Sequence, residues 1–170
     1  PGQRYAHALS LTGELRADVV PATEIAAAIE EVATALRGFS PEVDAAIDEP
    51  GVCWLDGRGM HALHRSATQW GKAIAGAVAA RGLEGAVVVG FTRFGTYAVA
   101  RARRGGITVF AADADERAAA RQVPLALLDI APRLRDALLR LGVATLGELV
   151  RLPAGGVLER FGADDHRLYA

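Results

Sequence analysis

Several residue types are scarce in this chain of 170 residues, and each scarcity narrows the possible structures. Cys53 is the only cysteine, which excludes an intramolecular disulfide and a cysteine-rich zinc site and favours a reducing, cytoplasmic setting. No apolar run approaches the length of a membrane-spanning helix, and the opening residues do not resemble a signal peptide. Pro1 has no preceding methionine, so we expect a fragment of a longer protein.

The chain also lacks an excess of positive or negative charge. The chain has 19 basic and 20 acidic residues, a formal net charge of -1, so it lacks the generally basic surface of many nucleic-acid-binding proteins. Any contact with nucleic acid would need a local cluster of basic residues. Lys72 is the only lysine, and the heavy use of alanine, arginine and glycine fits a genome's base composition better than a binding function. With 51% hydrophobic residues the chain can bury a core and form one or two small domains.

The central stretch from Val87 to Phe110 predicts a strand, a helix and a second strand in direct succession. Three valines ending at Gly90 are typical of a buried strand, and the following apolar residues recur at helical spacing. The residues after Gly106 resume as a strand. The helix is expected to end in a cluster of arginines followed by glycines: Arg101, Arg103, Arg104, Gly105 and Gly106.

Apolar spacing predicts further elements before this stretch, and their order favours an α+β fold with helices on a mostly antiparallel sheet. In chain order they are a helix over 5–15, a strand over 18–20, a helix capped by Thr23 and ending near Gly38, strands over 45–47 and 52–55, and a helix from 63 or 66 to Arg81.

The composition changes after Phe110. The polar, alanine-rich segment 111–123 is expected to contain a domain boundary and to act as a linker. Beyond it the spacing predicts two short helices joined by a tight turn, with Gly142 ending the first and Thr145 capping the second.

Two motifs in this arrangement resemble the Y-family translesion DNA polymerases. The palm of that family has a strand ending in glycine, a helix with alternating alanines and a glycine before the next strand, as in VVVGFTRFGTYAVARARRGGITVF. Its thumb has a helix-hairpin-helix with motifs similar to LGVATLGEL at 141–149 and RFG at 160–162. The resemblance implies the end of a fingers-like region over 1–20, a palm-like domain over 21–112 and a thumb-like helical domain over 113–170.

The chain departs from active members of the family at two places. Their palm helix opens with an Asn-Lys pair that grips the triphosphate, where this chain has Phe94-Gly95 and no cation. Their palm hairpin has an Asp-Glu pair just before a strand that ends in Leu-Asp. Here Asp48-Glu49 needs three extra residues before Leu55-Asp56, and the register without a gap, which we favour, aligns Gly51-Val52 with the carboxylates.

These departures resemble the ImuB subgroup, non-catalytic components of bacterial inducible (SOS) mutagenesis cassettes. The resemblance implies a DNA repair adaptor in translesion synthesis, without catalytic residues or a cofactor. Its implied partners are DNA, the replicative sliding clamp, an ImuA-like protein and an error-prone C-family polymerase. A fragment of an active error-prone polymerase, which would need Mg²⁺, is the alternative. A helix-hairpin-helix DNA-binding module unrelated to polymerases is a third possibility, which the palm-like order of elements argues against.

Each candidate site residue has a structural as well as a functional interpretation. Asp48, Glu49 and Asp56 are candidate metal ligands, but carboxylates beside a Pro-Gly turn are usually solvated turn residues. A zinc site and a base-stacking site are two further functional interpretations. For the residues concerned we favour an ordinary surface or core role over either of these functions. The residues concerned are Cys53, His61 and His64 for zinc, and Trp54 and Trp70 for stacking.

Arginines are the candidate DNA contacts. Arg101, Arg103 and Arg104 could bind phosphates or stabilise the end of their own helix. Arg133 and Arg135 add positive charge to the thumb-like helices, whose turn lacks the glycines of a phosphate-binding hairpin.

The resemblance also concerns polypeptide that precedes Pro1. It implies that the family's first strand, which lies inside the palm sheet, is upstream of this chain. We therefore expect the strands over 52–55 and 87–89 to have unpaired edges, and the chain to self-associate or to be less stable than a longer protein.

Overall fold

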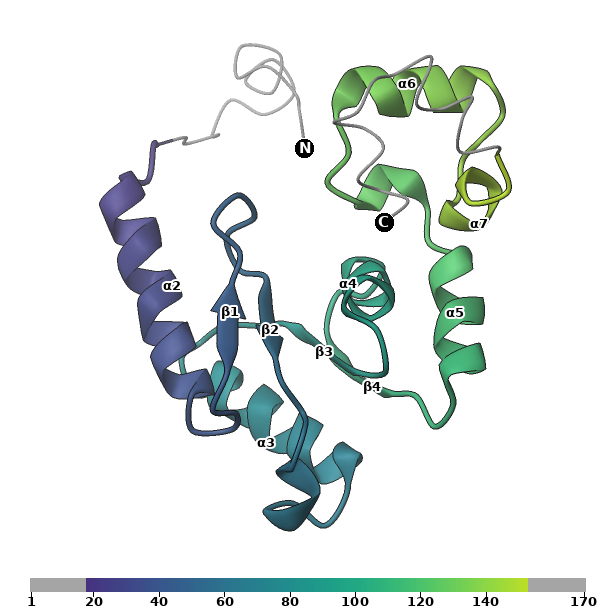
Figure 1. The fold of residues 1–170 in the computed structure, drawn as a ribbon. Coiled ribbons are helices and arrows are strands. Elements are labelled where there is room, and N and C mark those ends of the chain that lie inside the picture. The colour runs from purple at the N-terminus through teal and green to yellow at the C-terminus, as the bar shows by residue number, and fades with distance from the viewer. Residues whose placement is uncertain (1–17, 153–170) are drawn as a thin grey trace.

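The computed structural model describes residues 18–152, which form a mixed α+β fold (Figure 1). The predicted class is confirmed at this level. No helix in the described part of the chain is long and apolar enough to cross a membrane. The elements are α2 (Ala22–Leu36), β1 (Val43–Ala45), β2 (Cys53–Leu55), the 3-10 turn η1 (Met60–Ala62), α3 (Ala67–Ala79), β3 (Ala86–Val89), α4 (Arg93–Arg101), β4 (Gly106–Val109), α5 (Asp113–Arg121), the 3-10 turn η2 (Leu125–Leu127), α6 (Pro132–Arg140) and α7 (Leu146–Leu149).

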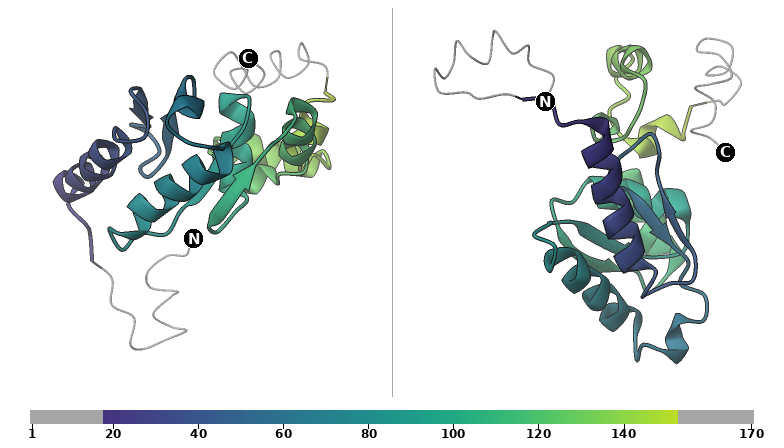
Figure 2. Two further views of the ribbon diagram at one scale, coloured as in Figure 1. Left: turned by 90° about the horizontal axis from the view of Figure 1, so that it is seen from below. Right: turned by 90° about the vertical axis from the view of Figure 1, so that its left-hand side faces the viewer.

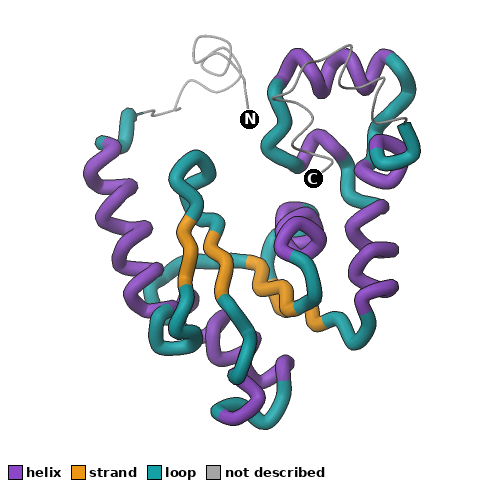
Figure 3. Tube along the Cα trace, in the orientation of Figure 1, coloured by secondary structure: helices purple, strands orange, loops and turns teal. Residues whose placement is uncertain are grey.

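The strands form two separate two-stranded sheets (Figure 3). β1 and β2 are antiparallel, with Val43 opposite Leu55, whereas β3 and β4 are parallel, with Ala86 opposite Gly106. The expectation of a mostly antiparallel sheet is therefore wrong for the second pair. The reason is the connection: α4 crosses from the end of β3 back to the start of β4, and such a crossover makes the two strands run in the same direction.

Successive residues of β3 point to two different apolar clusters. Val87 and Val89 pack with α2, α3 and the β1–β2 hairpin in the cluster that we call the N-terminal cluster. Val88 packs with α4, α5, α6 and α7 in the C-terminal cluster. β3 is thus covered on both faces, while α2 and the C-terminal helices lie at opposite ends of the fold (Figure 2).

Several predicted boundaries need correction. The expected strand over 18–20 is absent; Val19 is 86% exposed and no described strand lies beside it to pair with. Thr23 is not the helix cap, because the amides of Glu24 and Ile25 already donate to the carbonyl of Pro21 and α2 begins at Ala22. The first hairpin strand ends at Ala45 rather than at 47, since the turn starts with the Ala46 amide bonded to the Val52 carbonyl.

Other predicted signals are confirmed. Of the two alternative starts for the helix over 63–81 or 66–81, the one at Ser66 is correct: its side chain accepts a hydrogen bond from the Gln69 amide at the start of α3. Gly142 has a φ of 76°, the left-handed conformation that ends a helix, directly after α6. Thr145 and Glu148 form a reciprocal capping box at α7. The predicted helix over 5–15, the RFG motif and most of the fingers-like region lie outside the described residues.

The segment 111–123, expected to be a linker, contains α5. This helix packs against α4 and contributes Ala120 to the C-terminal cluster. Its first turn is acidic and Asp113 pairs with Arg117 one turn later, a spacing that stabilises helices. The polar composition of the segment therefore belongs to a surface helix. The three-domain division itself stays a prediction.

The facing edges of β2 and β3 are both unpaired within residues 18–152, as expected for the strands over 52–55 and 87–89. A groove of about 1710 Å³ lies between them and is lined by α2, the hairpin, α3 and α4. Self-association through these edges stays a prediction, which sedimentation over a range of concentrations would test.

Candidate functional site

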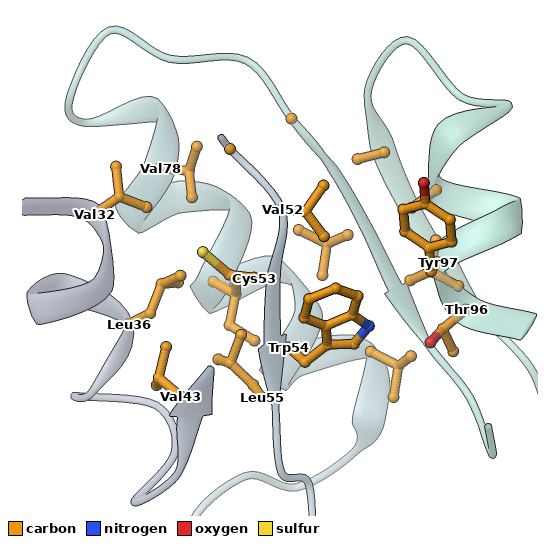
Figure 4. Close-up of a pocket in the computed structure, with 18 of the residues that line it drawn as sticks. Val32, Leu36, Val43, Val52, Cys53, Trp54, Leu55, Val78, Thr96 and Tyr97 are labelled. Atoms are coloured by element: carbon orange, nitrogen blue, oxygen red, sulfur yellow. The ribbon is translucent and has the colours of Figure 1, made fainter. Parts of the chain in front are cut away.

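The hairpin and α4 face each other across this groove. In Figure 4 the ring of Trp54 on β2 lies on the side of the strand that faces Thr96 and Tyr97 of α4, and all three side chains line the groove. The ring centroids of Trp54 and Tyr97 are 6.1 Å apart. Tertiary folding thus brings the carboxylate-bearing hairpin and the arginine-bearing helix into one region.

Glu49, in the hairpin turn, is held by α4 through two contacts. The hydroxyl of Tyr97 donates to Glu49 Oε2 at 2.7 Å, and Arg101 Nε lies 3.1 Å from Glu49 Oε1. Arg101 Nε donates its hydrogen to the Leu127 carbonyl at 3.0 Å, so its contact with Oε1 is an ion pair without a hydrogen bond. Burial and the bond to Glu49 raise the pKa of Tyr97. Glu49 therefore ties the hairpin tip to α4.

The other two carboxylates proposed as metal candidates lie elsewhere. Asp48 is exposed in the turn. Asp56 follows the far end of β2 and pairs with Arg58 at 2.5 Å, and hydrogen bonds from Arg58 lower the pKa of the Asp56 carboxyl. Asp56 is four residue steps along the strand from the turn residue Val52, or about 13 Å at the usual rise. Asp56 and Glu49 are consequently not brought together.

No three His, Cys, Asp or Glu side chains gather into a metal-binding group within the described part of the chain. Cys53 lines the groove, and burial followed by the charge of Asp44 raises the pKa of its thiol. His64 is half-buried, whereas the side chain of His61 lies outside the described residues. Trp70 is a core residue, as favoured, with 7% exposure and an indole N–H that donates to the Phe39 carbonyl.

Trp54 is half-buried, and the side chain of Arg93 lies over its ring. Arg93 Cζ lies 3.9 Å from the Trp54 ring centroid, which is the geometry of a cation–π contact. The same guanidinium pairs with Asp44 on β1 at 2.6 Å. Arg93 thus connects α4 to both strands of the hairpin.

The turn before α4 is built around a buried carboxylate from α5. Glu116 has 0% exposure, and its side chain accepts hydrogen bonds from the Phe91 amide, the Thr92 amide and the Thr92 hydroxyl. Thr92 in turn caps α4 by accepting from the Gly95 amide at 3.1 Å. The positive end of the α4 dipole is therefore matched by an anion of the chain itself.

The Glu116 carboxylate leaves space only for glycine at positions 90 and 95. A Cβ at either position would collide with the carboxyl group of Glu116. Gly95 belongs to the Phe94-Gly95 pair that the sequence resemblance is expected to align with an Asn-Lys pair. Its presence is explained by the need for space next to Glu116.

The candidate DNA-binding arginines fall into two groups. Arg101 ends α4 and is engaged by Glu49 and the Leu127 carbonyl, while Arg103 and Arg104 follow it as exposed residues that line the groove. Arg133 and Arg135 lie on α6, the first exposed and the second half-buried. No ion pair of Arg103 or Arg104 occurs within the described residues.

Sequence reasoning missed two parts of this site. The contact between Arg93 and Trp54 joins residues 39 positions apart and had no local signal. Glu116 was overlooked because its segment was interpreted as a linker. The acidic first turn of α5 was a usable signal, since Asp and Glu are typical of helix starts.

Comparison of the chain with protein-family models, curated proteins and solved structures found no match in any of the three.

Proposed function

We propose that the chain is the palm-like and thumb-like part of a DNA repair protein that resembles Y-family polymerases, does not polymerise DNA, and acts as an adaptor. The sequence resemblance to the ImuB subgroup carries the family part of this proposal. The order hairpin, α3, β3, α4, β4 is compatible with a palm-like sheet covered by helices, and α6 and α7 with a thumb-like helix-hairpin-helix.

The single observation that supports the loss of polymerase activity is the engagement of the hairpin carboxylates by the chain's own cations. Two-metal phosphoryl transfer needs carboxylates that together hold cations roughly 4 Å apart. Glu49 is paired with Arg101 and Asp56 with Arg58, at opposite ends of β2. These residues do not fit a two-metal centre, because metal binding would have to break both ion pairs and then bring the carboxylates together.

The start of α4 supports the same conclusion for nucleotide binding. A helix N-terminus at the end of a strand is a common phosphate site, since its free amides point at the ligand. Here the Phe91 and Thr92 amides already donate to Glu116. A triphosphate would have to displace a buried carboxylate and would find no lysine nearby in sequence.

DNA binding is proposed to use Arg103 and Arg104, with Arg101, Arg133 and Arg135 as further contributors. The first two are exposed and have no described ion pair, so their charge is available to phosphates. The sliding clamp, an ImuA-like protein and an error-prone C-family polymerase are proposed partners on the basis of the resemblance alone.

Primer extension tests the absence of polymerase activity. The full-length protein is incubated with a primer-template, four deoxynucleotides and Mg²⁺ or Mn²⁺, next to an active Y-family polymerase as positive control. We expect no extension above the protein-free reaction. Robust incorporation that disappears in the double variant Asp48→Ala, Glu49→Ala would overturn the adaptor proposal in favour of an error-prone polymerase.

Fluorescence anisotropy with the same primer-template tests DNA binding. The double variant Arg103→Ala, Arg104→Ala is expected to bind more weakly and with a salt slope lower by about one unit per lost phosphate contact. Arg117→Ala, which removes an arginine already paired with Asp113, is the matched control. Equal affinity and slope in the Arg103, Arg104 variant and wild type would remove these residues from the DNA interface.

A further inference from the structure

The surface of α4 combines exposed aromatic rings with positive charge. Phe91 is 55% exposed in the turn before α4, and Phe94 is 39% exposed in the first turn of the helix. Large aromatic side chains usually contribute to a core, so two exposed rings three residues apart need an explanation. The hydrogen bonds of Glu116 to the Phe91 and Thr92 amides hold the backbone that presents them.

Phe94 belongs to a larger aromatic cluster, and Phe91 lines the same groove as two members of that cluster, Trp54 and Tyr97. The Phe94 centroid is 6.1 Å from that of Tyr97, which is 6.1 Å from that of Trp54. Arg93 covers the Trp54 ring with its guanidinium, and its side chain is 59% exposed. Phe94, Tyr97, Trp54 and Arg93 therefore form one cluster, and we call this cluster, together with Phe91 in the adjoining turn, the α4 platform.

The chain segment that carries α4 contains only basic charges, while the buried carboxylate of Glu116, from α5, lies against the turn before this helix. No acidic residue occurs between Glu84 and Asp113, whereas Arg93, Arg101, Arg103 and Arg104 all lie in that interval. Asp44 and Glu49 from the hairpin neutralise Arg93 and Arg101. Arg103 and Arg104 line the same groove as Phe91, Trp54 and Tyr97 and have no described ion pair. Two arginines without a described ion pair therefore remain at the other end of α4, about 14 Å from Phe94 at the usual helical rise, although the whole chain carries -1.

A ligand that fits this surface needs both flat π-faces and negative charge. Unpaired nucleobases on a phosphate backbone meet both requirements, because bases stack on aromatic side chains and on guanidinium planes while phosphates contact arginine. A duplex does not, since its bases are stacked on each other and only its phosphates and groove edges are accessible. An acidic peptide offers charge without base faces.

We propose that the α4 platform is a binding site for single-stranded DNA, with unpaired bases stacked on Phe91 and Phe94 and phosphates at Arg103 and Arg104. This inference rests on the proposed DNA-binding function and specifies the form of DNA and the residues that select it. Recognition is independent of base sequence, because every base has a π-face.

The test uses a 12-nucleotide oligo(dT), a 12-nucleotide strand of the same charge in which the central bases are replaced by abasic sites, and a duplex. Anisotropy with the full-length protein is expected to give a Kd for oligo(dT) about tenfold lower than for the abasic strand, consistent with stacking of at least one base. The duplex is expected to bind more weakly than oligo(dT).

The variant Phe91→Ala, Phe94→Ala is expected to lose the preference for oligo(dT) over the abasic strand while keeping the wild-type salt slope. Phe94→Tyr retains a ring and should retain the preference. Leu139→Ala, at an apolar position on α6 that is 47% exposed, is the matched control. Thermal melting should show that all these variants stay folded, with at most a small decrease for the loss of the Phe94 contact with Tyr97.

Three results would overturn the proposal: equal binding of the oligo(dT) and abasic strands, an unchanged preference in the double phenylalanine variant, or equal binding of a polyglutamate chain of similar charge. In each of these cases the adaptor proposal stands if duplex or primer-template DNA still binds through Arg103 and Arg104. Failure to bind any form of DNA would overturn both this inference and the DNA-binding part of the proposed function.

Discussion

The two apolar clusters differ in how completely the described residues enclose them. The C-terminal cluster contains twelve buried residues, among them Leu125 and Leu138 with 0% exposure. The N-terminal cluster contains three, Leu36, Trp70 and Ile74, surrounded by half-buried side chains along an open groove. Amphipathic helices contribute to both clusters, so the amphipathicity of the helices does not explain the difference in burial.

Strand pairing accounts for the contrast. α4, α5, α6 and α7 all contribute buried residues to the C-terminal cluster, and Val88 of β3 and the segments between the helices complete it. Within residues 18–152, the N-terminal cluster lies instead beneath two small sheets whose facing edges are unpaired, and residues 22–28 in the first half of α2 are exposed. Ile25 is 38% exposed on that half, although it belongs to the same stripe as the buried Leu36. The candidate sites lie at the junction of the two regions, where α4 faces the hairpin.

The largest expected effect comes from truncating each cluster at a buried leucine. Leu138→Ala should lower the free energy of unfolding by about 4 kcal/mol, because its surroundings are closed and cannot collapse into the cavity. Leu36→Ala should cost about 2 kcal/mol, since it borders the groove, where neighbours can relax. Urea denaturation measures both. Equal losses would mean that the two clusters are equally well packed.

A smaller effect is expected at the buried carboxylate that joins α5 to the start of α4. Glu116→Gln keeps the shape but removes the charge that accepts three hydrogen bonds, and should lower stability by about 2 kcal/mol. Asp115→Asn, at an exposed neighbouring position, is the matched control and should be nearly neutral. If Glu116→Gln leaves the free energy of unfolding unchanged, the negative charge of Glu116 is not needed to stabilise the start of α4.

The smallest effect concerns pH and is confined to the C-terminal region. Hydrogen bonds from the Ala144 and Thr145 amides lower the pKa of Glu148 below its ordinary 4.5. A lowered pKa in the folded state contributes stability that is present above pH 4.5 and is lost as the pH falls through the folded-state value.

The stability difference between wild type and Glu148→Gln should accordingly shrink between about pH 7 and about pH 3, as followed by urea denaturation at each pH. Glu24→Gln, in the exposed first turn of α2, is the control for a general effect of losing one carboxylate. If the stability difference between wild type and Glu148→Gln does not change with pH, the Glu148 cap does not contribute to the pH dependence of stability.

The sequence by itself determined the local elements, because their causes are local. Apolar spacing located α2, α3, α4 and α6, while Gly142 marked the end of α6 and Thr145 the start of α7. Three valines in succession located β3. The errors lie where a local signal was absent or was misinterpreted: Val19 had no strand to pair with, and the polar surface of α5 was interpreted as a linker.

Tertiary structure alone decided which of these residues meet. The pairing of Glu49 with Arg101, the stacking of Arg93 on Trp54 and the burial of Glu116 beneath Thr92 all join segments at least 24 positions apart. Such contacts depend on how the elements pack, and no periodicity encodes them. The same carboxylates and arginines that suggested metal and phosphate binding in the sequence are, in the fold, partly bound to each other. The charge left over, at Arg103 and Arg104, is set by geometry.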